Sequence, residues 1–93
     1  MAEKFADRIK VYCDASGVEM PVGFYRHPAS RYFAIDMELL RPKLVAKTWF
    51  NQEDLVYYLK NLAQGKKMRI LDFKERRELY FEGGETLKHG REF

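Results

Sequence analysis

The hydrophobic and polar positions of this chain begin with a strict alternation. Over residues 8–13 the apolar Ile9, Val11 and Cys13 are separated by Lys10 and Tyr12. A period of two predicts a half-buried β-strand. The sequence therefore opens, on this pattern, with a first strand.

A turn and a return strand are expected next. Asp14 suits the first position of a turn, and Gly17 can supply the positive φ that hairpin loops require. Residues 18–26 are then the second strand. Pro21 cannot donate a ladder hydrogen bond, so this strand is expected at a sheet edge or with a bulge.

Two further strands follow before the period changes. Residues 31–37 and 43–49 are apolar and aromatic segments on either side of Pro42. At Asn51 a helical period begins, since leucines recur at positions 55, 59 and 62. Asn51 is a good N-cap, and Gly65 suits the end of a helix. These signals predict a helix over residues 51–64.

The last predicted elements form a hairpin. Residues 68–73 and 78–82 are strand-like and flank the polar loop 74–77. Residues 83–93 show no apolar period and are expected to be a flexible tail after a single domain, residues 1–82. The predicted class is α+β: a small antiparallel sheet, in the order β-β-β-β-α-β-β, with one amphipathic helix packed on one face.

Composition narrows the class of protein. Apolar residues make up 46% of the 93 residues and aromatic residues 15%, which is too rich for a disordered chain. The single cysteine, Cys13, excludes an intramolecular disulfide, and a secreted domain of this size usually carries several. The N-terminus has no signal-peptide pattern, and no apolar run is long enough to span a membrane. A cytoplasmic location is expected.

The residues that could carry chemistry are few. Cys13, His27 and His89 have no metal-site spacing, so no metal is expected. Ser16 and Ser30 lie in turn contexts, where a hydroxyl ordinarily bonds the local backbone. The glycines match neither the P-loop nor the dinucleotide-binding pattern. We therefore expect no enzyme activity, no catalytic residue and no cofactor.

The positive charge is concentrated in one segment. The chain carries 17 basic and 14 acidic residues, and residues 66–77 alone contribute a net +4. Basic groups neutralise phosphates, and a nearby aromatic ring can stack on an unpaired base. The sequence favours a small accessory domain that contacts nucleic acid through this hairpin. The candidate residues are Lys66, Lys67, Arg69, Lys74, Arg76, Arg77 and Tyr80.

Two alternatives remain at this stage. A mixed run such as KERRE is often only a solvated turn with local ion pairs. The excess of aromatic residues also suits a protein-interaction or regulatory module, including a homodimer. On the helix, Tyr57 and Tyr58 point about 100° apart, so one of them is expected to be exposed.

Overall fold

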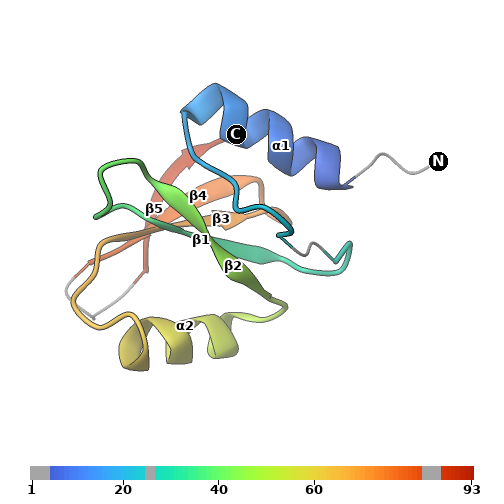
Figure 1. Cartoon of the computed structure of the whole chain (residues 1–93). Helices are drawn as coiled ribbons and strands as arrows, with labels where there is room; N and C mark the ends of the chain where they lie inside the picture. Colours follow the sequence, from blue (N-terminus) through green and yellow to red (C-terminus); the bar gives the residue numbers. More distant parts are fainter. Residues whose placement is uncertain (1–4, 25–26, 83–86) are drawn as a thin grey trace.

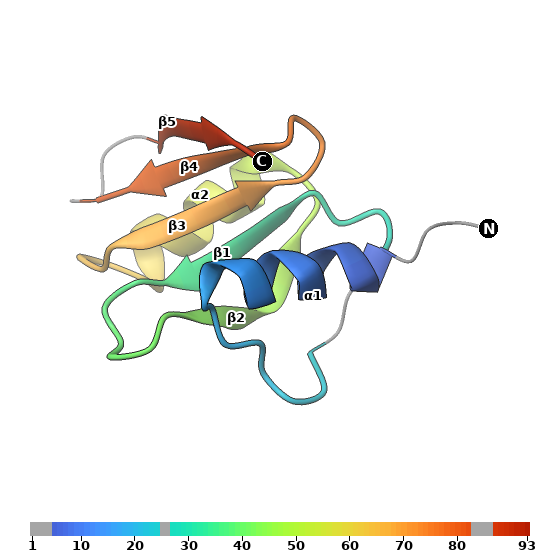
Figure 2. The same cartoon turned by 90° about the horizontal axis from the view of Figure 1, so that it is seen from above.

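A computed structural model of the chain describes residues 5–24, 27–82 and 87–93. Its centre is one antiparallel sheet of five strands in the order β2-β1-β3-β4-β5. Helices α1 and α2 lie on opposite sides of this sheet (Figures 1 and 2). The elements in chain order are α1 (Phe5–Ser16), β1 (Tyr32–Asp36), β2 (Lys43–Trp49), α2 (Gln52–Asn61), β3 (Met68–Asp72), β4 (Arg77–Phe81) and β5 (Leu87–Glu92). The predicted α+β class with an antiparallel sheet is confirmed, but the predicted order of elements is wrong at both ends.

The first strand predicted over residues 8–13 is instead the middle of helix α1. Ile9 and Cys13 are buried, whereas Val11, which alternation would place beside them, is 66% exposed. A spacing of four residues fits one helix face as well as one strand face. Asp7, which the same alternation would also bury, is charged and exposed, so only the helical spacing of four fits. The expected single helix is therefore one of two.

The predicted turn and second strand are also wrong, because helix α1 continues to Ser16. Gly17 does adopt a positive φ, of 72°, but it ends helix α1. The backbone N–H of Val18 donates to the carbonyl of Cys13 at 3.0 Å, the bond of a glycine-capped helix end. Of the described residues 18–24, only Glu19 pairs with a strand, through an isolated bridge to Lys43. Residues 25 and 26, the end of the predicted strand, lie outside the described residues.

The middle of the chain follows the sequence prediction closely. The predicted strands 31–37 and 43–49 correspond to β1 and β2, which pair with each other. Helix α2 begins at its predicted N-cap, because the Asn51 side chain accepts a hydrogen bond from the Asp54 backbone N–H at 2.8 Å. It ends at Asn61, three residues before the predicted end. Strands β3 and β4 form the predicted hairpin.

The predicted flexible tail is wrong for Leu87–Glu92. These residues form β5, which pairs with β4 at the sheet edge. Only Leu87 of this strand packs against a core cluster, so β5 is held mainly by its backbone ladder and carries no apolar period to detect. Residues 83–86, the start of that tail, lie outside the described residues.

Each face of the sheet carries its own core. On the α2 side, Leu55, Leu59 and Ala63 share a buried cluster with strand residues that include Ile70 and Phe81. On the α1 side, Ile9 and Cys13 share a second buried cluster with Phe33, Ile35 and Leu71. Residues of β3 alternate between the two clusters, as side chains on successive strand positions must. Neither described helix is long and apolar enough to cross a membrane.

Candidate functional site

The seven predicted binding residues do not form one surface. Lys66 and Lys67 precede β3, whereas Lys74 and Arg76 lie in the turn at its other end. A five-residue strand is about 16 Å long, which separates the two groups. Lys66 is also paired with Asp36, whose Oδ2 lies 2.8 Å from the ammonium nitrogen. Arg69, Arg77 and Tyr80 lie within the strands of the hairpin.

Arg69 and Tyr80 belong to a polar cluster beneath α1, built around Glu78. This carboxyl group is 1% exposed. Its Oε2 accepts a hydrogen bond from the Tyr12 hydroxyl, and its Oε1 accepts one from the Tyr80 hydroxyl at 2.8 Å. The Nε atoms of Arg69 and Arg91 lie 4.0 and 3.8 Å from the same Oε1. The cluster ties helix α1 to β3, β4 and β5.

Burial keeps the hydroxyl groups of the two tyrosines in this cluster protonated. Burial raises the pKa of Tyr12, and its hydrogen bond to Glu78 raises that pKa further. Burial also raises the pKa of Tyr80. Burial alone would lower the pKa of Arg69, but a hydrogen bond to the Tyr12 hydroxyl and nearby acidic groups outweigh it and raise that pKa. These side chains therefore serve the packing of α1.

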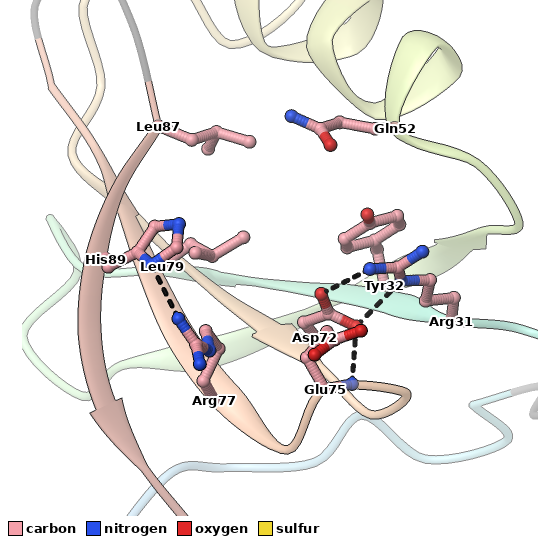
Figure 3. A pocket seen from close by; sticks show the side chains of 9 residues that line it. All are labelled: Arg31, Tyr32, Gln52, Asp72, Glu75, Arg77, Leu79, Leu87 and His89. Carbon is pink, nitrogen blue, oxygen red and sulfur yellow. Dashed lines mark hydrogen bonds and ion pairs between the residues drawn. The ribbon is translucent and has the colours of Figure 1, made fainter.

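Arg77 faces the opposite side of the sheet, in the pocket of Figure 3. Its Nη1 lies 2.6 Å from Nδ1 of His89, in a pocket of about 270 Å³. Because a guanidinium can only donate, Nδ1 is the acceptor and the imidazole proton is on Nε2. The hydrogen bond joins β5 to β4, so Arg77 and His89 contribute to the sheet edge.

The other wall of this pocket holds the hairpin turn. Arg31 donates from Nε and Nη2 to the two carboxylate oxygens of Asp72, both at 2.8 Å. Asp72 is 3% exposed, and its Oδ1 also accepts from the backbone N–H groups of Lys74 and Glu75. The Arg31 guanidinium and the Asp72 carboxylate, which face each other in Figure 3, are thus paired. Their arrangement fixes the turn at the end of β3.

Acidification below about pH 4 is expected to destabilise the fold through Asp72. Burial would raise its pKa, but the hydrogen bonds from Arg31 and the Glu75 backbone outweigh burial and lower it. A carboxyl with a depressed folded-state pKa adds stability above its unfolded pKa of about 3.9, and that stability is lost as the pH falls through the folded value. Urea unfolding between pH 2 and 7 should show a steeper fall for the native chain than for Asp72→Asn. Asp36, whose pKa is also lowered, titrates in both proteins, so equal slopes would contradict this role.

Three cations around the hairpin turn are exposed and have no ion pair among the described residues. They are Arg8 of α1 and Lys74 and Arg76 of the turn. The guanidinium of Arg8 lies over the rings of Phe5 and Phe73, 5.1 and 5.8 Å from their centroids. These cations are available to an external ligand.

Aromatic rings lie between these cations. The Phe93 ring packs edge-on against Phe73 and tilted against Tyr12, with centroids 5.3 Å apart in both pairs. Two hollows, of about 190 and 390 Å³, share Arg8 and Phe73 in their walls. We call these two hollows the tip groove. Its charged and aromatic lining consists of Phe5, Arg8, Tyr12, Arg31, Phe50, Phe73, Lys74, Arg76 and Phe93.

The backbone of the turn fixes one edge of the tip groove. Arg76 has a φ of 57°, in the left-handed region that residues other than glycine seldom adopt. Its carbonyl accepts a hydrogen bond from the backbone N–H of Phe93 at 2.9 Å. The turn and Phe93 are therefore held together. Backbone outliers of this kind cluster at functional sites, which makes Arg76 a candidate for function.

The sequence prediction named two of the residues that line the tip groove, Lys74 and Arg76. It did not name Arg8, which lies in the segment predicted as a strand, Phe5, which precedes that segment, or Phe93, which lies in the predicted tail. The charged Asp7, which a strand alternation would bury, is the signal that places Arg8 on a helix. No local signal brings Phe93 to the turn.

A further hollow lies where α2 meets β2. Tyr57 is 67% exposed there, as expected for one of the two helix tyrosines, and Leu62 and Phe50 are exposed beside it. They line a groove of about 370 Å³ next to Trp49 and Tyr58. Its lining contains one acidic and one basic residue, Asp54 and Lys47. This surface is apolar, whereas the tip groove combines rings with cations.

Comparison of the chain with models of known protein families, with curated proteins and with solved structures finds no match. Within residues 5–24, 27–82 and 87–93, no group of three or more His, Cys, Asp or Glu side chains could hold a metal ion. The chemistry of the tip groove is therefore the feature of the described structure that indicates a function.

Proposed function

We propose that this chain is a non-catalytic binding domain that contacts single-stranded nucleic acid through the tip groove. The observation that carries the proposal is the convergence of Arg8, Lys74 and Arg76 on a groove lined by Phe5, Phe73 and Phe93. A single cysteine, buried in the core, suits a cytoplasmic location as part of the same proposal.

The cations supply the sequence-independent part of the affinity. Each phosphate neutralised by Arg or Lys releases condensed counterions. Two of the three cations lie on a turn fixed by Asp72, and the third lies on a helix fixed by Glu78. The backbone at these positions is therefore held before a ligand arrives, which reduces the backbone entropy lost on binding.

The aromatic lining favours a single strand over a duplex. A base can stack on a ring only when its own face is uncovered, as in single-stranded nucleic acid. The rings of Phe73 and Phe93 line the wall of a hollow, so a base must leave a duplex stack to reach them. A flat basic surface without such rings would suit a duplex equally well.

The proposal narrows the set of residues predicted from the sequence. Lys74 and Arg76 remain in it, and Arg8 joins them. Arg69 and Tyr80 are engaged with Glu78, Arg77 is engaged with His89, and Lys66 and Lys67 lie at the far end of β3. We therefore expect these five residues to contribute little to phosphate contacts.

A salt titration tests the proposal directly. A fluorescein-labelled ten-nucleotide oligouridine, U10, should bind with micromolar affinity at 50 mM salt, as measured by fluorescence anisotropy. Three phosphate contacts on a single strand give a slope of about −2 when the logarithm of the binding constant is plotted against the logarithm of the salt concentration. The affinity should therefore fall about 15- to 20-fold between 50 and 200 mM salt. A duplex of equal length should bind more weakly. Absence of U10 binding at 50 mM salt would contradict the proposal.

A second candidate function is protein contact through the groove beside α2. Exposed Phe50, Tyr57 and Leu62 next to an aromatic pair are typical of an interface centre. A protein partner or a second copy of the chain would cover them. Absence of U10 binding would favour this function over nucleic-acid binding at the tip groove.

A further inference from the structure

The face of α2 that is turned away from the sheet carries a row of exposed side chains (Figures 1 and 2). The row consists of Glu53, Tyr57 and Lys60, which follow one another at spacings of four and three residues and therefore share one side of the helix. Leu55 and Leu59, on the opposite side, are buried in the core. Tyr57, in the middle of the row, is 67% exposed. We call this surface the outer face of α2.

The outer face holds an open hollow beside Tyr57, with a volume of about 540 Å³. Its walls include Glu53, Val56, Tyr57 and Lys60. Side chains at these spacings, one, four, five and eight along a helix, form the hole that receives a side chain from a facing helix. The Tyr57 ring is a side chain of the kind that fills such a hole. The same surface therefore supplies both the projecting group and the hollow for it, and two copies of it are complementary.

The charges of the outer face are also complementary between two copies. Glu53 lies in the first turn of α2 and Lys60 in its last turn. Neither has an opposite charge three or four positions away in its own helix, and the ion pairs found in residues 5–24, 27–82 and 87–93 include neither. A two-fold axis between Val56 and Tyr57 would place Glu53 of each copy opposite Lys60 of the other, because both are equally far from that axis.

We infer that two copies of this chain form a symmetric dimer in which their α2 helices pair antiparallel through the outer face. Each Tyr57 enters the hollow of the other copy, and two ion pairs between Glu53 and Lys60 fix the direction of the helices. A contact along one ten-residue helix is only about 15 Å long, so the interface is small and the dimer is weak.

The dimer is independent of the proposed function. No residue that lines the hollow of the outer face lines the tip groove, as far as the described residues define both. Helix α1, which contributes Arg8 to the tip groove, lies on the other side of the sheet from α2 (Figures 1 and 2). Both tip grooves therefore stay open in the dimer, and the outcome of the U10 titration does not decide whether the dimer forms.

Sedimentation equilibrium of the whole chain at 50 mM salt tests the dimer. The mean mass should rise from that of a monomer towards that of a dimer between about 10 µM and 1 mM protein, the range of a small interface. Tyr57→Ala should weaken the dimer at least ten-fold, because it removes the central ring of the contact. Tyr57 is exposed, so the variant should keep its fold, which circular dichroism checks.

Charge reversal tests the antiparallel pairing. Glu53→Lys and Lys60→Glu should each weaken the dimer about ten-fold, because each turns two attractive pairs into two repulsive ones. An equimolar mixture of these two variants should dimerise within about three-fold of the native affinity, since one copy then carries two lysines and the other two glutamates. Lys88→Glu reverses an exposed lysine of β5, outside the outer face, and should dimerise as the native chain does.

A native chain that is still a monomer at 1 mM would overturn the dimer. A dimer that Tyr57→Ala leaves unchanged would show that the outer face is not its interface. A mixture of Glu53→Lys and Lys60→Glu no more associated than either variant alone would overturn the antiparallel pairing of the helices.

Discussion

Replacing Glu78 with alanine is expected to lower the free energy of unfolding by about 3–5 kcal/mol, the cost of breaking a buried charged network by removing one partner. The carboxyl group is buried beneath α1 and accepts hydrogen bonds from two tyrosines, Tyr12 and Tyr80. Alanine would leave both hydroxyl groups without their acceptor and the Arg69 guanidinium without the carboxylate that lies 4.0 Å from its Nε. Urea denaturation followed by circular dichroism measures the loss.

Two variants bracket this result. Glu82→Ala removes an exposed glutamate just after β4 and should change the free energy of unfolding by less than about 0.5 kcal/mol. Tyr12→Phe removes the hydrogen bond donated to Glu78 and the one accepted from Arg69, and should cost about 2 kcal/mol. A Glu78→Ala protein that no longer unfolds cooperatively also agrees with this prediction, because the free energy of unfolding of a domain of this size is only about 5–15 kcal/mol. A Glu78→Ala protein as stable as Glu82→Ala would show that the cluster does not hold α1.

Glu78 also shows why part of the structure lay beyond the sequence. It stands in the run KERRE, which has the appearance of a solvated turn. Its main partner, Tyr12, is 66 residues away in the chain. Burial of a charged residue depends on such a distant partner, and no local pattern reveals the partner. The sequence prediction therefore placed Arg69 and Tyr80 on a binding surface.

The elements that were predicted correctly are defined by local chemistry. The Asn51 N-cap and the leucine period of α2 lie within one short segment. The β3–β4 hairpin has its two strands and its turn in continuous sequence. By contrast, β5 is identified only by its pairing with β4, since a charged edge strand has no apolar alternation.

Helix α1 was missed although its sequence contains the signal. Ile9 and Cys13 fit both periods, and the choice depended on Val11, which favours strands and yet is exposed. Asp7, a charged residue that the alternation would bury, is the local signal that favours a helix. The error mattered for the candidate site, because it removed Arg8 from the neighbourhood of the hairpin turn.

The tip groove is expected to lose about 100-fold in affinity for U10 when Arg8, Lys74 and Arg76 are all replaced with alanine. Removing each cation removes about one phosphate contact. The three contacts together account for about 3 kcal/mol of binding free energy. All three side chains are exposed, so the fold should remain intact. The affinity of the triple variant for U10 should also depend little on salt, with a slope near zero for the logarithm of the binding constant against the logarithm of the salt concentration.

The measurement that tests this account most directly compares that triple variant with a control of equal charge. The control replaces Lys43, Lys60 and Lys88, three exposed lysines that do not line the tip groove, with alanine. Anisotropy titrations with U10 at 50 mM salt should show the native affinity within about three-fold for the control and the 100-fold loss for the tip-groove variant. Equal losses in the two variants would mean that binding follows net charge alone, and would contradict a site at the tip groove.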